Sequence, residues 1–108
     1  MREAYYEQVE NINADLVEVT RLVGSAMNRA TQALLDADLQ LAEAVIDFDA
    51  KVDILTASID ERCFELIALQ APVATDLRVL LGAMRISSSL ERMGDLAEHV
   101  AKQARMRH

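Results

Sequence analysis

The chain has 108 residues, of which 52% are hydrophobic and 4% aromatic, with three glycines, one proline and a net charge of −7. This length suits one domain with its own core, and the scarcity of turn residues argues against a β-sandwich or barrel. Residues 36 to 65 carry nine acidic and two basic side chains, so this segment alone has a charge of −7. Such a segment would repel nucleic acid, and it suits cations or a basic patch on a partner protein.

Hydrophobic residues recur at alternating steps of four and three along the first third of the chain. A sustained repeat of this kind predicts a long helix with coiled-coil-like contacts, which we expect over residues 3–35. The first break falls at residues 36–38, where Asp36 or Asp38 is expected to cap the next helix. The expected core positions are Tyr5, Val9, Ile12, Leu16, Val19, Val23, Ala26, Ala30 and Ala33.

Two further stripes predict helices over residues 38–70 and 73–105. Pro72 separates them, because the residue before a proline is pushed out of the α region, and Pro72 itself suits the start of the third helix. The expected core positions are Leu41, Val45, Phe48, Val52, Leu55, Ile59, Leu66 and Leu69 in the second helix, and Val79, Ala83, Ile86, Leu90, Met93, Ala97, Val100 and Ala104 in the third.

Helices joined by short connections pack as antiparallel neighbours. Residues 1–108 are therefore expected to form a single all-α domain, with three long antiparallel helices in an up-down-up bundle. Three helices leave apolar shoulders exposed, and burying apolar surface contributes about 25 cal/mol per Å². We therefore expect the chain to self-associate as a homodimer or another homo-oligomer.

Two pairs of acidic residues, Asp49 with Asp53 and Glu91 with Asp95, are each spaced one helical turn apart. Like charges at this spacing destabilise a helix by about 0.2–0.5 kcal/mol. Both pairs are expected on shoulders beside the core stripe and at similar height, so four carboxylates would line one groove. Oxygen ligands of this kind suit hard cations, although acidic pairs on solvated helices are common without any function. Gly94, inside the second pair, would let a ligand or another helix approach closely.

Targeting features are few. The longest uncharged run, residues 66–75, is too short to cross a bilayer, and residues 1–10 lack a basic region followed by an apolar stretch. Cys63 has no partner for an internal disulfide and is expected to pack as a small apolar residue in a reducing cytoplasm. These features predict a cytoplasmic location.

Several separated segments resemble the PhoU family of phosphate-signalling and phosphate-transport regulatory proteins. The most specific are residues 69–78, with the sequence LQAPVATDLR, and residues 90–95, with the sequence LERMGD. Residues 1–6 and 49–53 match the family pattern as well, so the resemblance covers essentially the whole chain. Family members usually carry two tandem three-helix repeats, and this chain resembles only the first.

The resemblance implies a cytoplasmic negative regulator of the phosphate-starvation response. Such a protein couples the ATPase of a phosphate ABC transporter to a sensor histidine kinase by protein–protein contacts, with no catalysis, no nucleic-acid binding and at most peripheral contact with the membrane. Some members bind multinuclear metal clusters through a Glu/Asp-x-x-x-Asp motif. Carried over to this chain, the metal ligands would be Asp49, Asp53, Glu91 and Asp95, and the candidate ions are iron, zinc, manganese or magnesium.

Two positions depart from the family pattern. His99 stands where the family often has Asn, and it would offer a nitrogen ligand or simply be solvated. Thr56 stands where the family often has a charged residue. Both departures leave the number and kind of metal ions open.

Two other classes of function stay open. One is a generic helical adaptor or oligomerisation domain whose carboxylates have no metal role. The other is a carboxylate-bridged metal enzyme, but a ferritin-like di-iron site needs Glu-x-x-His on two helices, and neither His99 nor His108 follows a glutamate at that spacing. A Gly-rich phosphate loop and a Ser or Cys beside a plausible base are also missing from the sequence.

Overall fold

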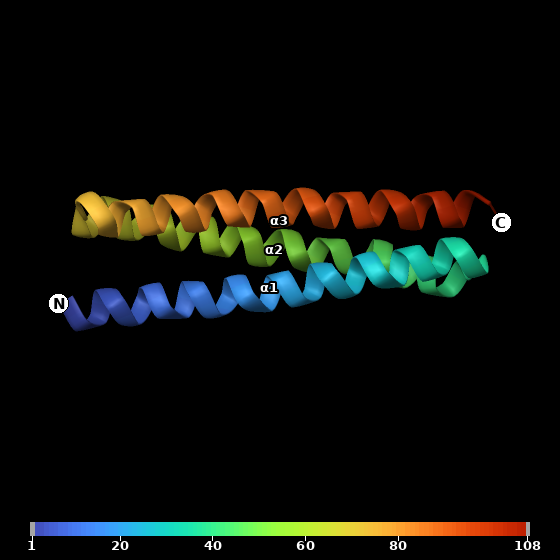
Figure 1. The fold of residues 1–108 in the computed structure, drawn as a ribbon, viewed down its shortest axis with the longest axis horizontal. Helices are drawn as coiled ribbons and strands as arrows, with labels where there is room; N and C mark the ends of the chain where they lie inside the picture. Colours follow the sequence, from blue (N-terminus) through green and yellow to red (C-terminus); the bar gives the residue numbers. More distant parts are fainter. Residues whose placement is uncertain (1, 108) are drawn as a thin grey trace.

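The computed structural model describes residues 2–107, and these form three helices (Figure 1). They are α1 (Arg2–Asp36), α2 (Leu39–Gln70) and α3 (Ala74–Met106), with no strand among the described residues. The predicted all-α three-helix architecture is confirmed. Each observed helix boundary lies within one residue of the predicted one.

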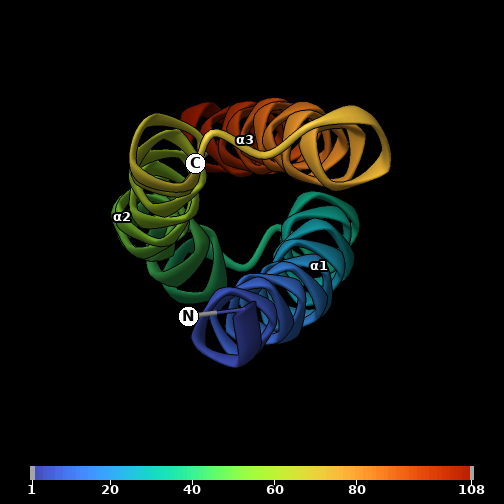
Figure 2. The same cartoon turned by 90° about the vertical axis from the view of Figure 1, so that its left-hand side faces the viewer.

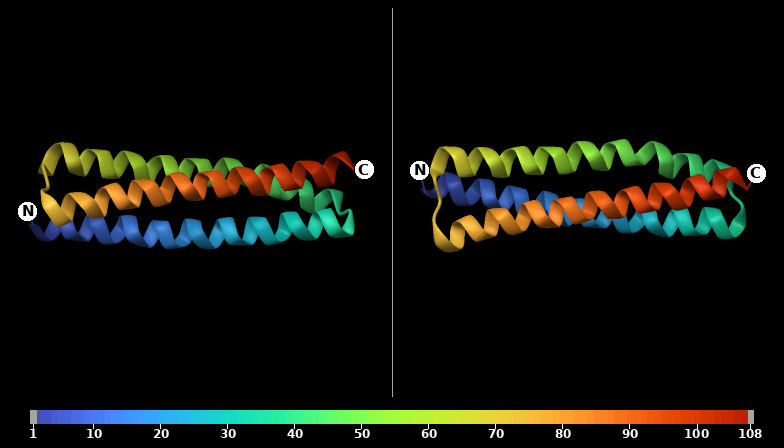
Figure 3. Two further views of the ribbon diagram at one scale, coloured as in Figure 1. Left: turned by 45° about the horizontal axis from the view of Figure 1, so that its top comes forward. Right: turned by 90° about the horizontal axis from the view of Figure 1, so that it is seen from above.

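The three helices form an elongated bundle with extents of 55 × 17 × 17 Å. Seen from one end, they occupy the corners of a triangle, so that each helix packs against both others (Figure 2). The chain runs up, down and up again, which leaves α1 and α3 parallel to each other and α2 antiparallel to both (Figure 3). Each pair of helices therefore borders one groove along the outside of the bundle.

The first connection is capped as the sequence predicts. The Asp38 side chain accepts a hydrogen bond from the backbone N–H of Leu41 at 3.0 Å, and this bond satisfies a free donor at the start of α2. Ala37 takes up a left-handed conformation with φ 54°, and the Asp38 N–H returns to the Ala33 carbonyl at 2.9 Å. This pattern is typical of a helix C-terminus closed by a left-handed residue.

The second connection differs from the prediction in one detail. Ala71 closes α2 in a left-handed conformation, and its N–H donates to the Ile67 carbonyl at 3.1 Å. Pro72 was expected to open the third helix, but it lies in the connection. Val73 is extended, with φ −121° and ψ 160°, so α3 begins only at Ala74.

The core stripe of α1 is confirmed. All of its predicted positions are buried except Val9, which is partly buried against the core. Cys63 on α2 is also buried, as expected of a small apolar residue. No helix among the described residues combines the length and the apolar character that crossing a membrane requires.

The predicted core stripes of α2 and α3 are half right. Phe48 and Leu55 are only partly buried, Leu69 is exposed, and Val79, Ile86 and Met93 are about half exposed. Every second predicted position is correct. At most of the others the buried residue is the next one along the chain, and it is smaller or polar except at Leu80. The buried residues are Ala42, Val45, Asp49, Val52, Thr56, Ile59, Cys63 and Leu66 on α2, and Leu80, Ala83, Ser87, Leu90, Gly94, Ala97, Ala101 and Ala104 on α3.

The buried hydroxyl groups of α2 and α3 find partners across the helix contact. Ser87 donates its hydroxyl hydrogen bond to the Thr56 carbonyl at 3.2 Å. The Thr56 hydroxyl lies 3.1 Å from the Asp53 carbonyl and 3.3 Å from a carboxylate oxygen of Glu91. Because these groups are satisfied, polar residues are tolerated at core positions here. This polar layer connects directly to the acidic residues of the site.

A candidate carboxylate metal site between α2 and α3

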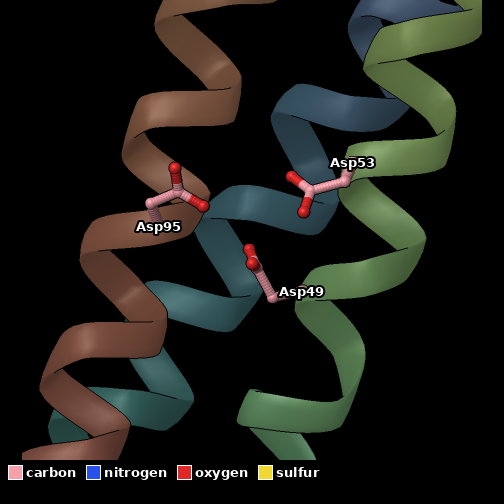
Figure 4. Close-up of side chains that lie close together, drawn as sticks. All are labelled: Asp49, Asp53 and Asp95. Carbon is pink, nitrogen blue, oxygen red and sulfur yellow. The ribbon is translucent and has the colours of Figure 1, made fainter.

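Three carboxylates from two helices converge in the groove between α2 and α3. Asp49 and Asp53 project from α2, and Asp95 projects toward them from α3 (Figure 4). One oxygen of each lies within 4.8 Å of an oxygen of the others. The predicted meeting of the two acidic pairs at one height in the bundle is therefore seen for these three residues.

Asp49 is the residue on which this cluster is built. It was expected on a shoulder beside the core. This expectation is wrong, because α2 turns Asp49, rather than Phe48, toward the core of the bundle. The residue is only 7% exposed. Its Oδ1 atom is buried and has no hydrogen-bond partner among the described residues. An unsatisfied buried carboxylate oxygen is costly unless a proton or a cation compensates it.

Gly94 explains how a carboxyl group can occupy a core position. A Cβ atom at Gly94 would lie 3.2 Å from Oδ1 of Asp49 and 3.3 Å from Cγ1 of Val52. Both distances are tighter than ordinary van der Waals contact, so the glycine leaves the space that the Asp49 side chain fills. The sequence prediction that Gly94 permits a close approach is confirmed, and the approaching group is a side chain of α2.

Glu91 and Glu98 border the cluster on α3. Glu91 was predicted as a fourth ligand, but it lies outside the converging group of three and instead accepts a hydrogen bond from Thr56. Glu98 was missed in the sequence analysis, although it interacts with Asp49. Its spacing offered a signal, because residues 91, 95 and 98 follow steps of four and three and so share one face of a helix. His99 is exposed and is not part of the group.

The electrostatics of the cluster favour a proton or a cation. The pKa of the Asp49 carboxyl group is raised to about 7, first by burial, then by hydrogen bonding to Glu98, and then by the negative charges of Asp53, Glu98 and Asp95. The pKa of Asp53 is raised as well, by burial and by the charge of Asp95. The pKa of Glu98 is lowered, mainly because Lys102 lies 3.0 Å away. The most buried acid of the cluster, Asp49, thus has a raised pKa because other acids lie beside it.

The donor set fits a hard cation. Carboxylate oxygens bind such ions at about 2.0–2.6 Å, so oxygens on opposite sides of one ion lie about 4–5 Å apart. The observed separation within 4.8 Å agrees with this range. The unsatisfied Oδ1 atom of Asp49 would gain a partner, and the positive charge would offset the mutual repulsion of the carboxylates.

The fold and the site define a class of protein, a long three-helix bundle that carries a carboxylate cluster on one interhelical groove. The family model for the PhoU domain matches residues 16–104. The chain belongs to the PhoU family.

Individual relatives match over most or all of the chain. A phosphate-specific transport system accessory protein PhoU homolog 2 from Mycobacterium tuberculosis is 53% identical over all 108 residues, which make up 51% of that protein. A PhoU homolog 1 from Mycobacterium leprae is 52% identical over the same residues, which cover 49% of its length. A homolog from Aquifex aeolicus is 40% identical over 99 residues, 92% of this chain and 45% of that protein. The chain thus spans about half the length of these curated relatives.

We predict that Asp49→Asn stabilises the metal-free protein progressively more as the pH rises from about 4 to about 7. The native carboxyl group keeps its proton up to about pH 7, whereas the unfolded chain loses it near the ordinary value of 3.8. The native state binds more protons in this window, so the contribution of Asp49 to stability falls by at most about 1.4 kcal/mol per pH unit.

Asparagine does not titrate, and urea unfolding of both proteins with a chelator present measures the difference. The gap in free energy of unfolding should widen up to about pH 7 and then level off. A gap that is independent of pH would contradict the assignment of a buried, protonated Asp49.

We predict that Gly94→Ala lowers stability relative to Gly24→Ala. Each change removes a helix-interior glycine, which favours the helix by about 1 kcal/mol. At Gly24 the added Cβ meets nothing within 4 Å, whereas at Gly94 it crowds Asp49 and Val52. Thermal unfolding in dilute solution should show stabilisation for Gly24→Ala and little or negative change for Gly94→Ala. Equal gains at both positions would mean that Asp49 does not need the space left by Gly94.

Proposed function

We propose that this chain is a phosphate-transport accessory domain that acts as a negative regulator of the phosphate-starvation response. The observation that carries the proposal is the match of the entire chain, at 53% identity, to a protein named as a phosphate-specific transport system accessory protein. The chain spans about half of that relative, so the activity of the whole relative is carried over to this chain only as a proposal. Residues 1–108 would form one three-helix domain.

The proposed mechanism is regulated protein–protein contact. The domain would couple the ATPase of a phosphate ABC transporter to a sensor histidine kinase at the cytoplasmic face of the membrane. It would have no catalytic turnover of its own and would not bind nucleic acid. The acidic surface, with its net charge of −7, supports contact with basic patches on partner proteins.

The carboxylate site would add a bound metal ion to this surface. Asp49, Asp53 and Asp95 are the proposed ligands. Glu91 and Glu98 lie beside them and would supply further carboxylate oxygens to the bound ion. Magnesium, manganese and iron(III) suit such ligands better than copper(I), and zinc also binds carboxylates. The ion would replace the net repulsion in the groove with a fixed positive centre and so change what the α2–α3 face presents to a partner.

The double variant Glu91→Gln/Asp95→Asn tests the metal site. It removes two charges while keeping side-chain size and hydrogen-bonding capacity, so it should abolish stoichiometric metal binding. The stability of the metal-free protein should stay unchanged or rise slightly, because exposed like charges repel by tenths of a kcal/mol, about 0.2–0.5 per pair. Elemental analysis and titration calorimetry with Mn²⁺ measure the binding.

The matched control is Glu61→Gln/Glu65→Gln. It removes two exposed charges at the same i, i+4 spacing, but on α2 and away from the cluster. It should bind metal like the wild type. Normal binding by the Glu91/Asp95 variant would place the site elsewhere. A wild-type protein that binds no metal would support the plain helical adaptor, and oxidase turnover with iron would support the metal enzyme.

Deletion of the natural gene tests the regulatory role separately. We expect phosphate-starvation genes to be expressed in phosphate-rich medium, because the signal that silences the kinase would be lost. A transcriptional reporter measures this effect, and the wild-type gene should restore silencing. Unchanged expression after deletion would remove the regulatory assignment, whatever the metal content of the protein.

A further inference from the structure

Each helix of the triangle has an outer side that faces neither of its neighbours (Figure 2). On α3 this side carries three exposed arginines, which we call the arginine line. Arg85 lies midway between the buried residues Ala83 and Ser87. Each residue turns a helix by about 100°, so a side chain two positions from both buried neighbours points away from the core. Arg78 and Arg92 lie seven residues before and after Arg85 and extend the line in both directions.

The outer sides of the other two helices do not share this charge. On α2 the positions midway between buried residues hold Asp47, Ile54 and Glu61. On α1 the basic residue at such a position, Arg21, is paired with Glu18 at 2.6 Å. The whole chain has a net charge of −7. A row of three positive side chains is therefore an exception on an acidic molecule.

The arginine line has no ion pair within the chain. Carboxylates that neutralise a helical arginine usually lie three or four residues away. Around these three arginines such positions hold Ala, Thr, Leu, Gly and Ser, and the exception is Asp95, three residues after Arg92. Asp95 projects toward the carboxylates of α2 instead (Figure 4). Among the described residues, the ion pairs all involve other basic side chains, Arg21, Arg62 and Lys102. The charge of the line is thus left to an external anion.

Short and apolar side chains flank the arginine line. Gly82, Ser88 and Ser89 occupy the turns between the arginines, and a Cβ atom at Gly82 would meet nothing within 4 Å. Leu81 is 41% exposed and Leu96 is 51% exposed. The surface is therefore low enough between the guanidinium groups for another chain to approach, and the two leucines offer it apolar contact.

We propose that the arginine line of α3 is a docking surface for an acidic helix of a partner protein. Residues seven apart are separated by about 10.5 Å along a helix, so the line presents three cations over about 21 Å. A partner helix with Asp or Glu at every seventh position repeats this spacing. Charged residues pair between neighbouring helices in this way beside the apolar contacts of coiled coils. The planar guanidinium group of arginine can also donate two parallel hydrogen bonds to one carboxylate.

The charges around the line favour a narrow partner over an extended anionic surface. The bundle is 17 Å across, and the carboxylate cluster and the acidic outer side of α2 lie beside α3. A lipid bilayer or a nucleic acid that covers the bundle would come under the influence of these acids, because charges act over about 8–10 Å at ordinary salt. A helix about 10 Å wide can contact the arginines and leucines alone.

The contact adds a second kind of partner chemistry to the proposed function. The acidic surface of the domain suits basic patches, whereas the arginine line suits an acidic segment. It requires neither a bound metal ion nor the regulatory role, because it depends only on the side chains of the outer face of α3. Its failure would leave the metal site and the regulatory proposal unaffected.

Peptide binding to the 108-residue chain tests the proposal. The probe is a labelled, alanine-rich helical peptide of about 22 residues, with glutamate at every seventh position and leucine beside it. The comparison peptide has the same composition, with its glutamates distributed around the helix. Fluorescence anisotropy with a chelator present measures both affinities. The wild type should bind the first peptide at least about 10-fold more tightly, because only that peptide can pair with all three arginines.

The variant Arg78→Gln/Arg85→Gln/Arg92→Gln removes the charge of the line. It should weaken binding of the first peptide at least about 10-fold. Lysine at the same three positions should restore most of the binding, because the positive charge is kept while the two parallel hydrogen bonds are lost. All three positions are exposed, so the variants should keep the helical circular dichroism and the thermal unfolding of the wild type.

The matched control, Arg21→Gln/Lys51→Gln/Arg105→Gln, removes three positive charges from exposed positions outside the line. It should bind the first peptide as the wild type does. Equal losses in the two glutamine variants would show an effect of net charge alone and would overturn the proposal. Equal affinity for both peptides, or no binding of either, would also overturn it. Phosphatidylglycerol vesicles that bind the wild type but not the line variant, when neither peptide binds, would assign the line to a lipid surface instead.

Discussion

The carboxyl group of Asp49, buried opposite Gly94, is the constraint on which the rest of the site depends. A core position of a helical bundle ordinarily holds an apolar residue, and a charged carboxylate there is strongly destabilised. The bundle accommodates it because Gly94 leaves the necessary space, and because the carboxyl group can keep a proton up to about pH 7. Asp53 and Asp95 then surround a group that is already short of a partner. A bound cation would give the buried Oδ1 atom of Asp49 a partner and would offset the repulsion among the three carboxylates.

The three grooves give this small fold three separate kinds of surface. An ion pair and a cation–π contact join α1 and α2, carboxylates line the contact between α2 and α3, and exposed apolar side chains such as Ile86 lie on the remaining side of α3. A three-helix bundle has the same geometry on all sides, so side-chain chemistry alone distinguishes these surfaces.

The fold followed closely from the sequence, because the steps of three and four on α1 and the break at Pro72 each have a single physical meaning. For α2 and α3, however, the sequence did not predict correctly which residues face the core. At Phe48–Asp49 and at Met93–Gly94 the more apolar residue of each pair was expected inside, yet the smaller or more polar one is buried. Hydrophobicity does not predict which of two neighbouring residues is buried when the space available between two helices determines the size of the buried side chain. The acidic pairs were recognised from their spacing, whereas the burial of Asp49 and the contact with Glu98 required the packing of α2 against α3.

The most direct measurement is a carboxyl-carbon NMR titration of Asp49, carried out on the metal-free protein and repeated with a diamagnetic ion such as Mg²⁺ or Zn²⁺. We expect a pKa near 7 for Asp49 in the absence of metal, because the group is buried among other acids. With saturating metal the carboxylate should stay ionised well below that pH, since a ligand must give up its proton to bind. An Asp49 that titrates near 3.8 without metal, and does not respond to either ion, would contradict a buried carboxyl group poised to bind a cation.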